Sequence, residues 1–191
     1  MKEGDLIPVQ YLTEIPAGTK KALEKRLIKL QKHYLDEDIC AADFAWKALN
    51  LASDIIKALE FKEKSVCKAG CHYCCIDVPV AVSYGEARLI ARRAKLPTKN
   101  PNRKNTDFNF EKSGACRFLK DGKCSIYEVR PLACRAFFSV DSVQHCIDDI
   151  QHKTFTVESN EALLEINAMM LINEKRKKTG KAMFGELEEW F

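Results

Sequence analysis

The sequence predicts a mainly α-helical fold, in which helices surround an irregular, cysteine-rich and metal-ligated centre with one short β-hairpin. Apolar residues recur at helical spacing near both ends of the 191-residue chain. Between these regions, residues 67–75 read CKAGCHYCC and place four cysteines within nine positions. The pair Asp121–Gly122, between two β-prone runs, is typical of a tight hairpin turn. We therefore expect helices at the two ends and irregular, cross-linked chain between them.

The N-terminal part predicts a helical hairpin, with helices over residues 20–34 and 37–62. The first helix has an apolar stripe at Leu23, Leu27, Leu30 and Tyr34. The stripe of the second comprises Ile39, Ala42, Trp46, Leu49, Ala52, Ile56 and Leu59. Cys40 lies beside this stripe, and we expect it in the core because free cysteine behaves as a small hydrophobe.

The middle of the chain shows several boundary signals. An extended run is expected over residues 76–82, and Ser83 with Glu86 forms a capping box for a short helix that runs through Arg92 or Ala94. Residues 97–113 are polar and basic, which favours a solvated loop; the alternative is a contact surface for an acidic partner or RNA. A two-residue hairpin turn would place Leu119 opposite Cys124, and Cys116 opposite Tyr127.

The last third predicts more helices. Pro131 suits the first position of a helix that would carry Cys134 near its N-terminus, where the helix dipole favours a thiolate. A further helix is expected to start after Asp141 or Ser142, and a long one over residues 159–177. The terminal Trp190 and Phe191 are expected to dock on the body of the protein. We expect one domain over residues 1–191, made of the N-terminal hairpin (1–64), the cysteine-cluster core (65–150) and a C-terminal helical segment (151–191).

Composition narrows the class of protein. The formal net charge is only +4 and basic residues are interleaved with acidic ones, so we expect no nucleic-acid partner. No apolar run approaches the roughly 20 residues of a membrane span, and the N-terminus has no apolar signal segment. We therefore expect a cytoplasmic protein. Thiols stay reduced in that compartment, so its nine cysteines favour metal ligation over disulfides.

Closely spaced thiolates are the soft ligands that zinc and iron–sulfur clusters prefer. The predicted metal ligands are Cys67, Cys71, Cys74, Cys75, Cys116, Cys124, Cys134 and Cys146. Because Cys74 and Cys75 are neighbours, their side chains point apart, and each is expected to bind a different ion or a different iron. Two groups of four, or one cluster plus a second site, both fit this count. A vicinal disulfide or a redox relay is the alternative.

Basic residues accompany the cysteines. Four thiolates around Zn²⁺ leave a charge of about −2, which is costly to bury without compensation. Arg130 and Arg135 flank Cys134, and we expect both to bind the cofactor by neutralising it or by donating hydrogen bonds to sulfur. His72 and His145 adjoin cysteines as well, but eight cysteines already suffice as ligands.

Three motifs together resemble the YkgJ-type cysteine cluster family, named for zinc or iron chelation. They are the C-x3-C-x2-C-C start, the C-x-x-L…G-x-C-x-I-Y hairpin from Cys116 to Tyr127, and the R-P-x-x-C-R segment from Arg130 to Arg135. The resemblance covers about residues 67–146. It implies metal chelation by these cysteines and no particular reaction, although a similar cluster occurs in flagellin lysine methylases. The first three cysteines also match the radical-SAM spacing, but this chain lacks the length and the alternating strands of that barrel.

The sequence thus predicts a metal-binding protein that chelates an iron–sulfur cluster or zinc. Two alternatives stay open. One is a zinc-stapled interaction module that meets a protein partner through residues 97–113. The other is a metal-dependent transferase or redox enzyme.

Overall fold

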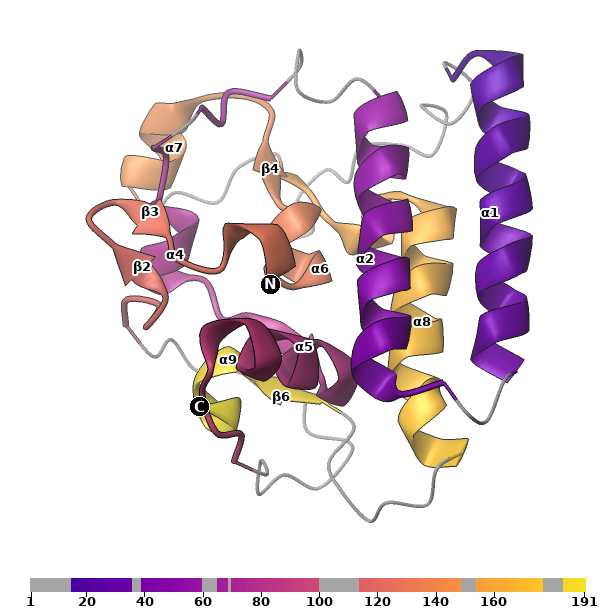
Figure 1. Cartoon of the computed structure of the whole chain (residues 1–191). Coiled ribbons are helices and arrows are strands. Elements are labelled where there is room, and N and C mark those ends of the chain that lie inside the picture. Colours follow the sequence, from indigo (N-terminus) through magenta and orange to yellow (C-terminus); the bar gives the residue numbers. More distant parts are fainter. Residues whose placement is uncertain are drawn as a thin grey trace.

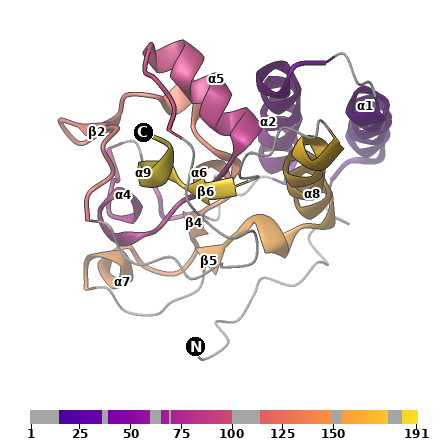
Figure 2. The ribbon, with the colours of Figure 1, turned by 90° about the horizontal axis from the view of Figure 1, so that it is seen from below.

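The computed structural model describes residues 15–35, 39–59, 65–68, 70–99, 114–148, 154–176 and 184–191, and its fold is mainly α-helical, as predicted. Three long helices pack together at one end of the molecule: α1 (Ala17–Leu35), α2 (Ala41–Ala58) and α8 (Glu161–Arg176) (Figures 1 and 2). The predicted N-terminal hairpin and the long C-terminal helix are therefore confirmed. Among the described residues, no helix is long and apolar enough to cross a membrane.

Helix α2 is the centre of the hydrophobic core. Its predicted stripe is buried at Ala42, Leu49, Ala52 and Ile56, but Trp46 is 42% exposed, so that part of the prediction is wrong. The helix instead buries residues on several sides, because α1, α5 and α8 all pack against it; the additional ones are Phe44, Ala45, Ala48, Leu51 and Ile55.

The expectation that Cys40 lies in the core is also wrong. Cys40 is the exposed N-cap of α2, and its Sγ lies 3.0 Å from the Asp43 carboxylate. A capping residue stands outside the helix it precedes, so the apolar periodicity of the helix does not extend to it.

Helix α5 (Tyr84–Ala94) begins with the predicted capping box of Ser83 and Glu86. It approaches α2 closely at Gly85, where an added Cβ would lie 2.8 Å from the carbonyl oxygen of Ala41. Glu86 is 2% exposed, and its carboxylate accepts hydrogen bonds from Ser83 N, Ser83 Oγ and Leu132 N at 2.7–2.8 Å. This side chain therefore ties α5 to helix α6 (Leu132–Arg135), which carries Cys134.

Short antiparallel strand pairs connect distant parts of the chain. The predicted hairpin is confirmed as β2 (Leu119–Lys120) with β3 (Lys123–Cys124), and Leu119 pairs with Cys124 as expected. Asp121 and Gly122 form its turn with φ of 49° and 70°, the left-handed region that such a turn requires. Cys116 lies before β2, so the expected pairing with Tyr127 does not form.

Two further strand pairs were not predicted. β1 (Ala81–Ser83) pairs with β6 (Phe184–Glu186), and β4 (Phe138–Ser139) pairs with β5 (Thr154–Phe155). Each strand has only two or three residues, too few to show a recognisable alternation of apolar and polar side chains.

The remaining elements are single turns. They are α4 (Cys74–Asp77), η2 (Tyr127–Val129), α7 (Val143–Ile147), η3 (Val157–Ser159) and α9 (Leu187–Trp190). Helix α4 occupies the start of the run that was expected to be extended. The C-terminal residues dock as predicted: Trp190 is fully buried and its Nε1 donates to Val82 O at 3.1 Å. Phe191 packs edge-on against Phe118 at 5.4 Å.

The buried carboxylate gives a first prediction. Replacing Glu86 by Ala (Glu86→Ala) leaves the buried N–H groups of Ser83 and Leu132 without an acceptor, which costs about 2–4 kcal/mol of unfolding free energy. Urea denaturation measures this loss. The exposed Glu24→Ala on α1 is the control and should change stability by less than about 0.5 kcal/mol.

The difference in stability between wild type and Glu86→Ala should also depend on pH, and this dependence is a second test. Burial raises the pKa of Glu86 above 4.5, although its hydrogen bonds to Leu132 and Ser83 oppose the rise. Between 4.5 and the raised value the folded chain keeps a proton that the unfolded chain has lost. The contribution of Glu86 to the free energy of unfolding is therefore complete below pH 4.5, and it declines as the pH rises through the raised pKa of Glu86. The stability gap between wild type and Glu86→Ala should narrow over this window, and a gap that widens would contradict the assignment.

Candidate metal centre

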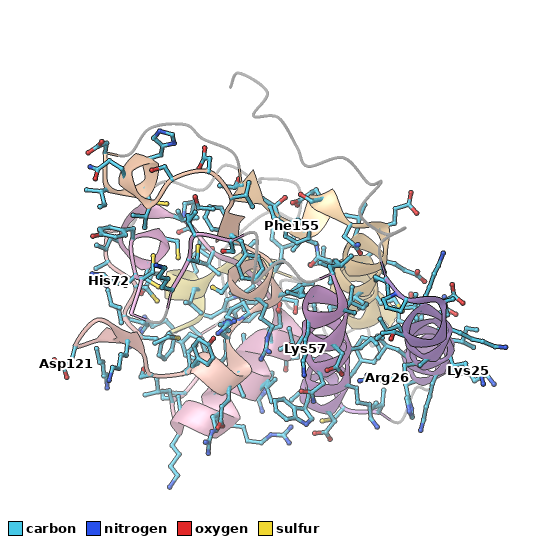
Figure 3. The ribbon with its side chains drawn as sticks, turned by 90° about the horizontal axis from the view of Figure 1, so that it is seen from above. Lys25, Arg26, Lys57, His72, Asp121 and Phe155 are labelled. Atoms are coloured by element: carbon cyan, nitrogen blue, oxygen red, sulfur yellow. The ribbon has the colours of Figure 1, made fainter. Side chains whose placement is uncertain are left out.

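The eight predicted ligand cysteines come from separate short segments at one end of the molecule. Figure 3 shows sulfur atoms gathered at the end where His72 lies, away from α1. Backbone hydrogen bonds join the segments: Cys116 N donates to Cys75 O at 2.7 Å, and Val66 N donates to Ser139 O at 3.1 Å. Contacts between remote segments, rather than one continuous loop, therefore position the cysteines.

One set of cysteines, here called the first sulfur group, comprises Cys67, Cys71 and Cys146. Burial raises the pKa of Cys71, and the neighbouring thiols of Cys67 and Cys146 raise it further. Cys67 Sγ also accepts a hydrogen bond from Ser139 N at 3.4 Å, which fixes it beside β4. Cys146 lies on α7, whose N-cap Ser142 accepts a hydrogen bond from Gln144 N.

The second sulfur group comprises Cys75, Cys116, Cys124 and Cys134. Burial raises the pKa values of Cys116, Cys124 and Cys134, and in each case the interaction with Cys75 adds to the rise. Cys134 interacts with all three other members of this group. The four side chains thus share one environment although they come from α4, the chain before β2, β3 and α6.

The expectation that the helix end favours a thiolate at Cys134 is wrong. Burial raises the pKa of Cys134 well above the usual value of a thiol. Helix α6 has only four residues, so the few peptide dipoles it aligns are outweighed by the cost of removing a thiolate from water.

Cys74 connects the two sulfur groups. Its side chain interacts with that of Cys75, so the expectation that the two neighbours point apart is wrong; the interaction raises the pKa of Cys74 and lowers that of Cys75 to about 6. Cys74 also interacts with Cys71 of the first sulfur group and with Cys134 of the second. The vicinal pair therefore stands where the two groups meet.

Arg130 supplies positive charge to the second sulfur group. Its guanidinium lies 3.8 Å from the ring centroid of Tyr127, and it acts to lower the pKa values of Cys75, Cys124 and Cys134. Its Nε is buried and has no hydrogen-bond partner among the described residues. A buried N–H without an acceptor beside several thiols fits an anionic thiolate centre, which would provide that acceptor.

Arg135 makes hydrogen bonds to backbone carbonyls and to helix α2. It is 8% exposed, and its guanidinium donates to Arg130 O at 2.8 Å, to Ser53 Oγ at 2.7 Å and to Glu128 O. These bonds connect the backbone of Arg130 to Ser53 on helix α2. Arg135 thus fixes the segment that carries Arg130 and Cys134 against the helical core.

The two histidines beside the cysteines each have a polar contact. His72 Nδ1 lies 2.9 Å from Gly70 O and its ring stacks on Tyr73, while His145 Nδ1 lies 3.2 Å from the Asp141 carboxylate. Sequence reasoning missed Glu188 on α9. Its carboxylate accepts from Arg117 N at 3.1 Å and contributes to the raised pKa of Cys116. The acidic tail GELEEWF gave no signal that one of its carboxylates lies near a cysteine.

The sulfur atoms lie near one another, but in the described part of the chain they do not surround a metal-ion site. Within residues 15–35, 39–59, 65–68, 70–99, 114–148, 154–176 and 184–191, no group of three or more His, Cys, Asp or Glu side chains has an arrangement that could hold a metal ion. Most of the predicted partner loop, residues 100–113, lies outside the described residues. Cys40 stands apart, in contact with Asp43 and Arg92.

Comparison with known proteins identifies one family. Residues 66–162, just over half of the chain, match the family CxxCxxCC, described as "Putative zinc- or iron-chelating domain". The spacing here has three residues between Cys67 and Cys71, one more than the short name of the family indicates. No curated protein and no solved structure shows a significant match to the chain. The family match agrees with the gathering of cysteines in the fold and supports metal binding in general, and the chain therefore belongs to the CxxCxxCC family.

Proposed function

We propose that the protein holds zinc or iron–sulfur clusters in two centres of four cysteines each. The first would contain Cys67, Cys71, Cys74 and Cys146, and the second Cys75, Cys116, Cys124 and Cys134. The observation that carries this proposal is the placement of the cysteines: the hydrogen bond from Cys116 N to Cys75 O joins two segments of the second sulfur group, and the thiols within each group raise one another's pKa. Four thiolates per centre match the usual ligand number of structural zinc and of iron–sulfur clusters.

The second sulfur group, unlike the first, has described basic side chains assigned to it. Arg130 would donate from Nε to a ligand sulfur and offset the negative charge of the centre. Arg135 acts through the backbone of Arg130, which it holds by a hydrogen bond, so we assign it as a positioning residue.

The bound metal would supply cross-links that the local structure lacks. Strands β2, β3 and β4 have two residues each, and helices α4, α6 and α7 have four or five. Segments of this size bury little apolar surface of their own, so coordination would contribute to folding free energy directly. This reasoning favours a structural contribution of the metal in residues 65–148.

The division into two centres predicts separable metal loss. Cys71→Ser should remove the metal of the first centre and Cys124→Ser that of the second, because each removes one of four ligands. Elemental analysis of natively purified protein should show each single variant losing part of the wild-type metal, and the double variant losing both parts.

The matched control is Cys40→Ser, which removes an exposed thiol outside both groups and should keep the wild-type metal content. Complete metal loss from either single variant would show one joint centre and contradict the division. The visible spectrum of anaerobically purified protein identifies the metal: sulfide-to-iron charge-transfer bands accompany an iron–sulfur cluster, whereas a zinc protein is colourless.

The position of Arg130 predicts its effect on affinity. Arg130→Gln removes the buried positive charge and should weaken metal retention by about 10–100-fold, the usual range for residues that contact metal ligands. Competition with a chromogenic chelator measures this change. Arg93→Gln, which breaks only the exposed ion pair with Glu128, should leave retention at the wild-type value. Equal weakening in both variants would contradict the assignment of Arg130.

Metal removal should affect the two parts of the molecule differently. Treatment with a strong chelator should expose residues 65–83 and 114–148 to limited proteolysis, while α1, α2, α5 and α8 preserve most of the far-ultraviolet circular dichroism. Mass spectrometry of the fragments locates the cuts. Cleavage that remains unchanged after complete metal removal would show that the metal has no structural role.

A further inference from the structure

The outer face of helix α1 carries an unusual concentration of charge. The helix has six basic residues and one acidic residue, Glu24, which gives a net charge of +5. Because the whole chain has a formal charge of +4, all residues outside α1 together carry −1. The small net charge of the whole chain therefore does not reveal that α1 is strongly basic.

Helical geometry collects most of this charge in one stripe. Lys21, Lys25, Lys29 and Lys32 are exposed and recur at intervals of four, four and three residues, which places them on one side of the helix. The opposite side packs into the core through Leu23, Leu27, Leu30 and Tyr34. Figure 3 shows Lys25 on the side of α1 that faces away from α2, while Arg26 lies nearer to α2 and pairs with Asp54 at 2.6 Å. These four lysines are here called the lysine stripe.

No acidic side chain that the structure describes forms an ion pair with the lysine stripe. Among the described residues, no carboxylate lies within 4.0 Å of any of its four amino groups. Successive lysines are about 4.5–6 Å apart along the helix axis and the stripe spans about 16.5 Å, given a rise of about 1.5 Å per residue. It thus presents a regular row of positive charges to solvent.

We propose that the lysine stripe is a docking surface for the phosphate backbone of a double-stranded nucleic acid. A regular array of single charges matches a polymer whose negative charges also repeat regularly. Lysine is depleted at protein–protein interfaces, which rely on aromatic and arginine contacts. The stripe contains no aromatic residue on which an unpaired base could stack, so it suits a duplex rather than a single strand.

An anionic membrane is a poorer match. A helix that lies in a membrane surface inserts an apolar face beneath its basic residues. The apolar face of α1 is occupied by the protein core, and Ile28, which is 53% exposed, is the one large apolar side chain beside the stripe that the structure describes as exposed. The contact would therefore be electrostatic and independent of base sequence. It concerns the end of the molecule opposite the sulfur groups, so it does not depend on the metal proposal.

Fluorescence anisotropy with a labelled mixed-sequence DNA duplex of about 20 base pairs, and the full chain purified with its metal, tests the proposal. Four phosphate contacts predict a slope of about −3.6 in log affinity against log salt, which is about a 150-fold loss of affinity between 50 and 200 mM. Replacing all four lysines of the stripe by Gln, a good helix former, should abolish binding at both salt concentrations. Lys25→Gln alone should make the slope of log affinity against log salt less steep by about 0.9.

The matched control replaces four other exposed lysines by Gln, namely Lys47, Lys95, Lys99 and Lys120, and so changes the net charge equally. It should keep at least most of the wild-type affinity. Circular dichroism and metal content should match wild type in both quadruple variants, which excludes unfolding. Equal loss of binding in both variants would overturn the proposal, as would no duplex binding at 50 mM salt. Stronger binding to phosphatidylserine-containing vesicles or to polyglutamate than to the duplex would also overturn it, in favour of a membrane or an acidic protein.

Discussion

The arrangement of the cysteine region depends on how negative charge on sulfur is tolerated inside the protein. Metal binding requires thiolates, but burial and mutual repulsion raise the pKa values of Cys71, Cys116, Cys124 and Cys134. Arg130 opposes this effect in the second sulfur group, and it does so from a fixed place: its guanidinium lies over Tyr127 and its carbonyl accepts from Arg135. Arg135 in turn bonds Ser53 on α2. Hydrogen bonds therefore join the packed helices to Arg130, whose charge acts on the cysteines of the second sulfur group.

The two halves of the molecule are stabilised in different ways. The long helices bury apolar side chains against α2, as hydrophobic packing requires. The cysteine region has elements of two to five residues, and it is held by contacts between distant segments, such as Cys116 N to Cys75 O, and by the Glu86 carboxylate that joins α5 to α6. Such contacts can position side chains from several segments around one point, which a single helix face cannot do. The irregular backbone is thus what allows eight cysteines to approach one another.

The sequence predicted those features that local signals determine. Helical periodicity identified α1, α2 and α8, the Ser83–Glu86 capping box identified the start of α5, and Asp-Gly identified the hairpin with Leu119 opposite Cys124. It could not predict the pairs β1–β6 and β4–β5, because strands of two or three residues have no pattern and their partners are distant in sequence. Cysteine spacing indicated a metal-binding region, but the division into sulfur groups depends on tertiary contacts. The exposure of Cys40 and Trp46, and the raised pKa of Cys134, likewise depend on packing.

The C-terminal segment supports the cysteine region although it lies outside the residues that match the family. Residues 184–191 lie beyond the match, yet β6 pairs with β1 immediately before α5, and Trp190 bonds Val82 O from within the core. The same segment brings Phe191 against Phe118 and the Glu188 carboxylate to Arg117 N, next to Cys116. A tail of eight residues thus contacts both the strand that precedes the Glu86 capping box and the chain that leads into the hairpin. Because both contacts fall on segments that position the second sulfur group, the geometry of that group depends on residues that no cysteine motif includes.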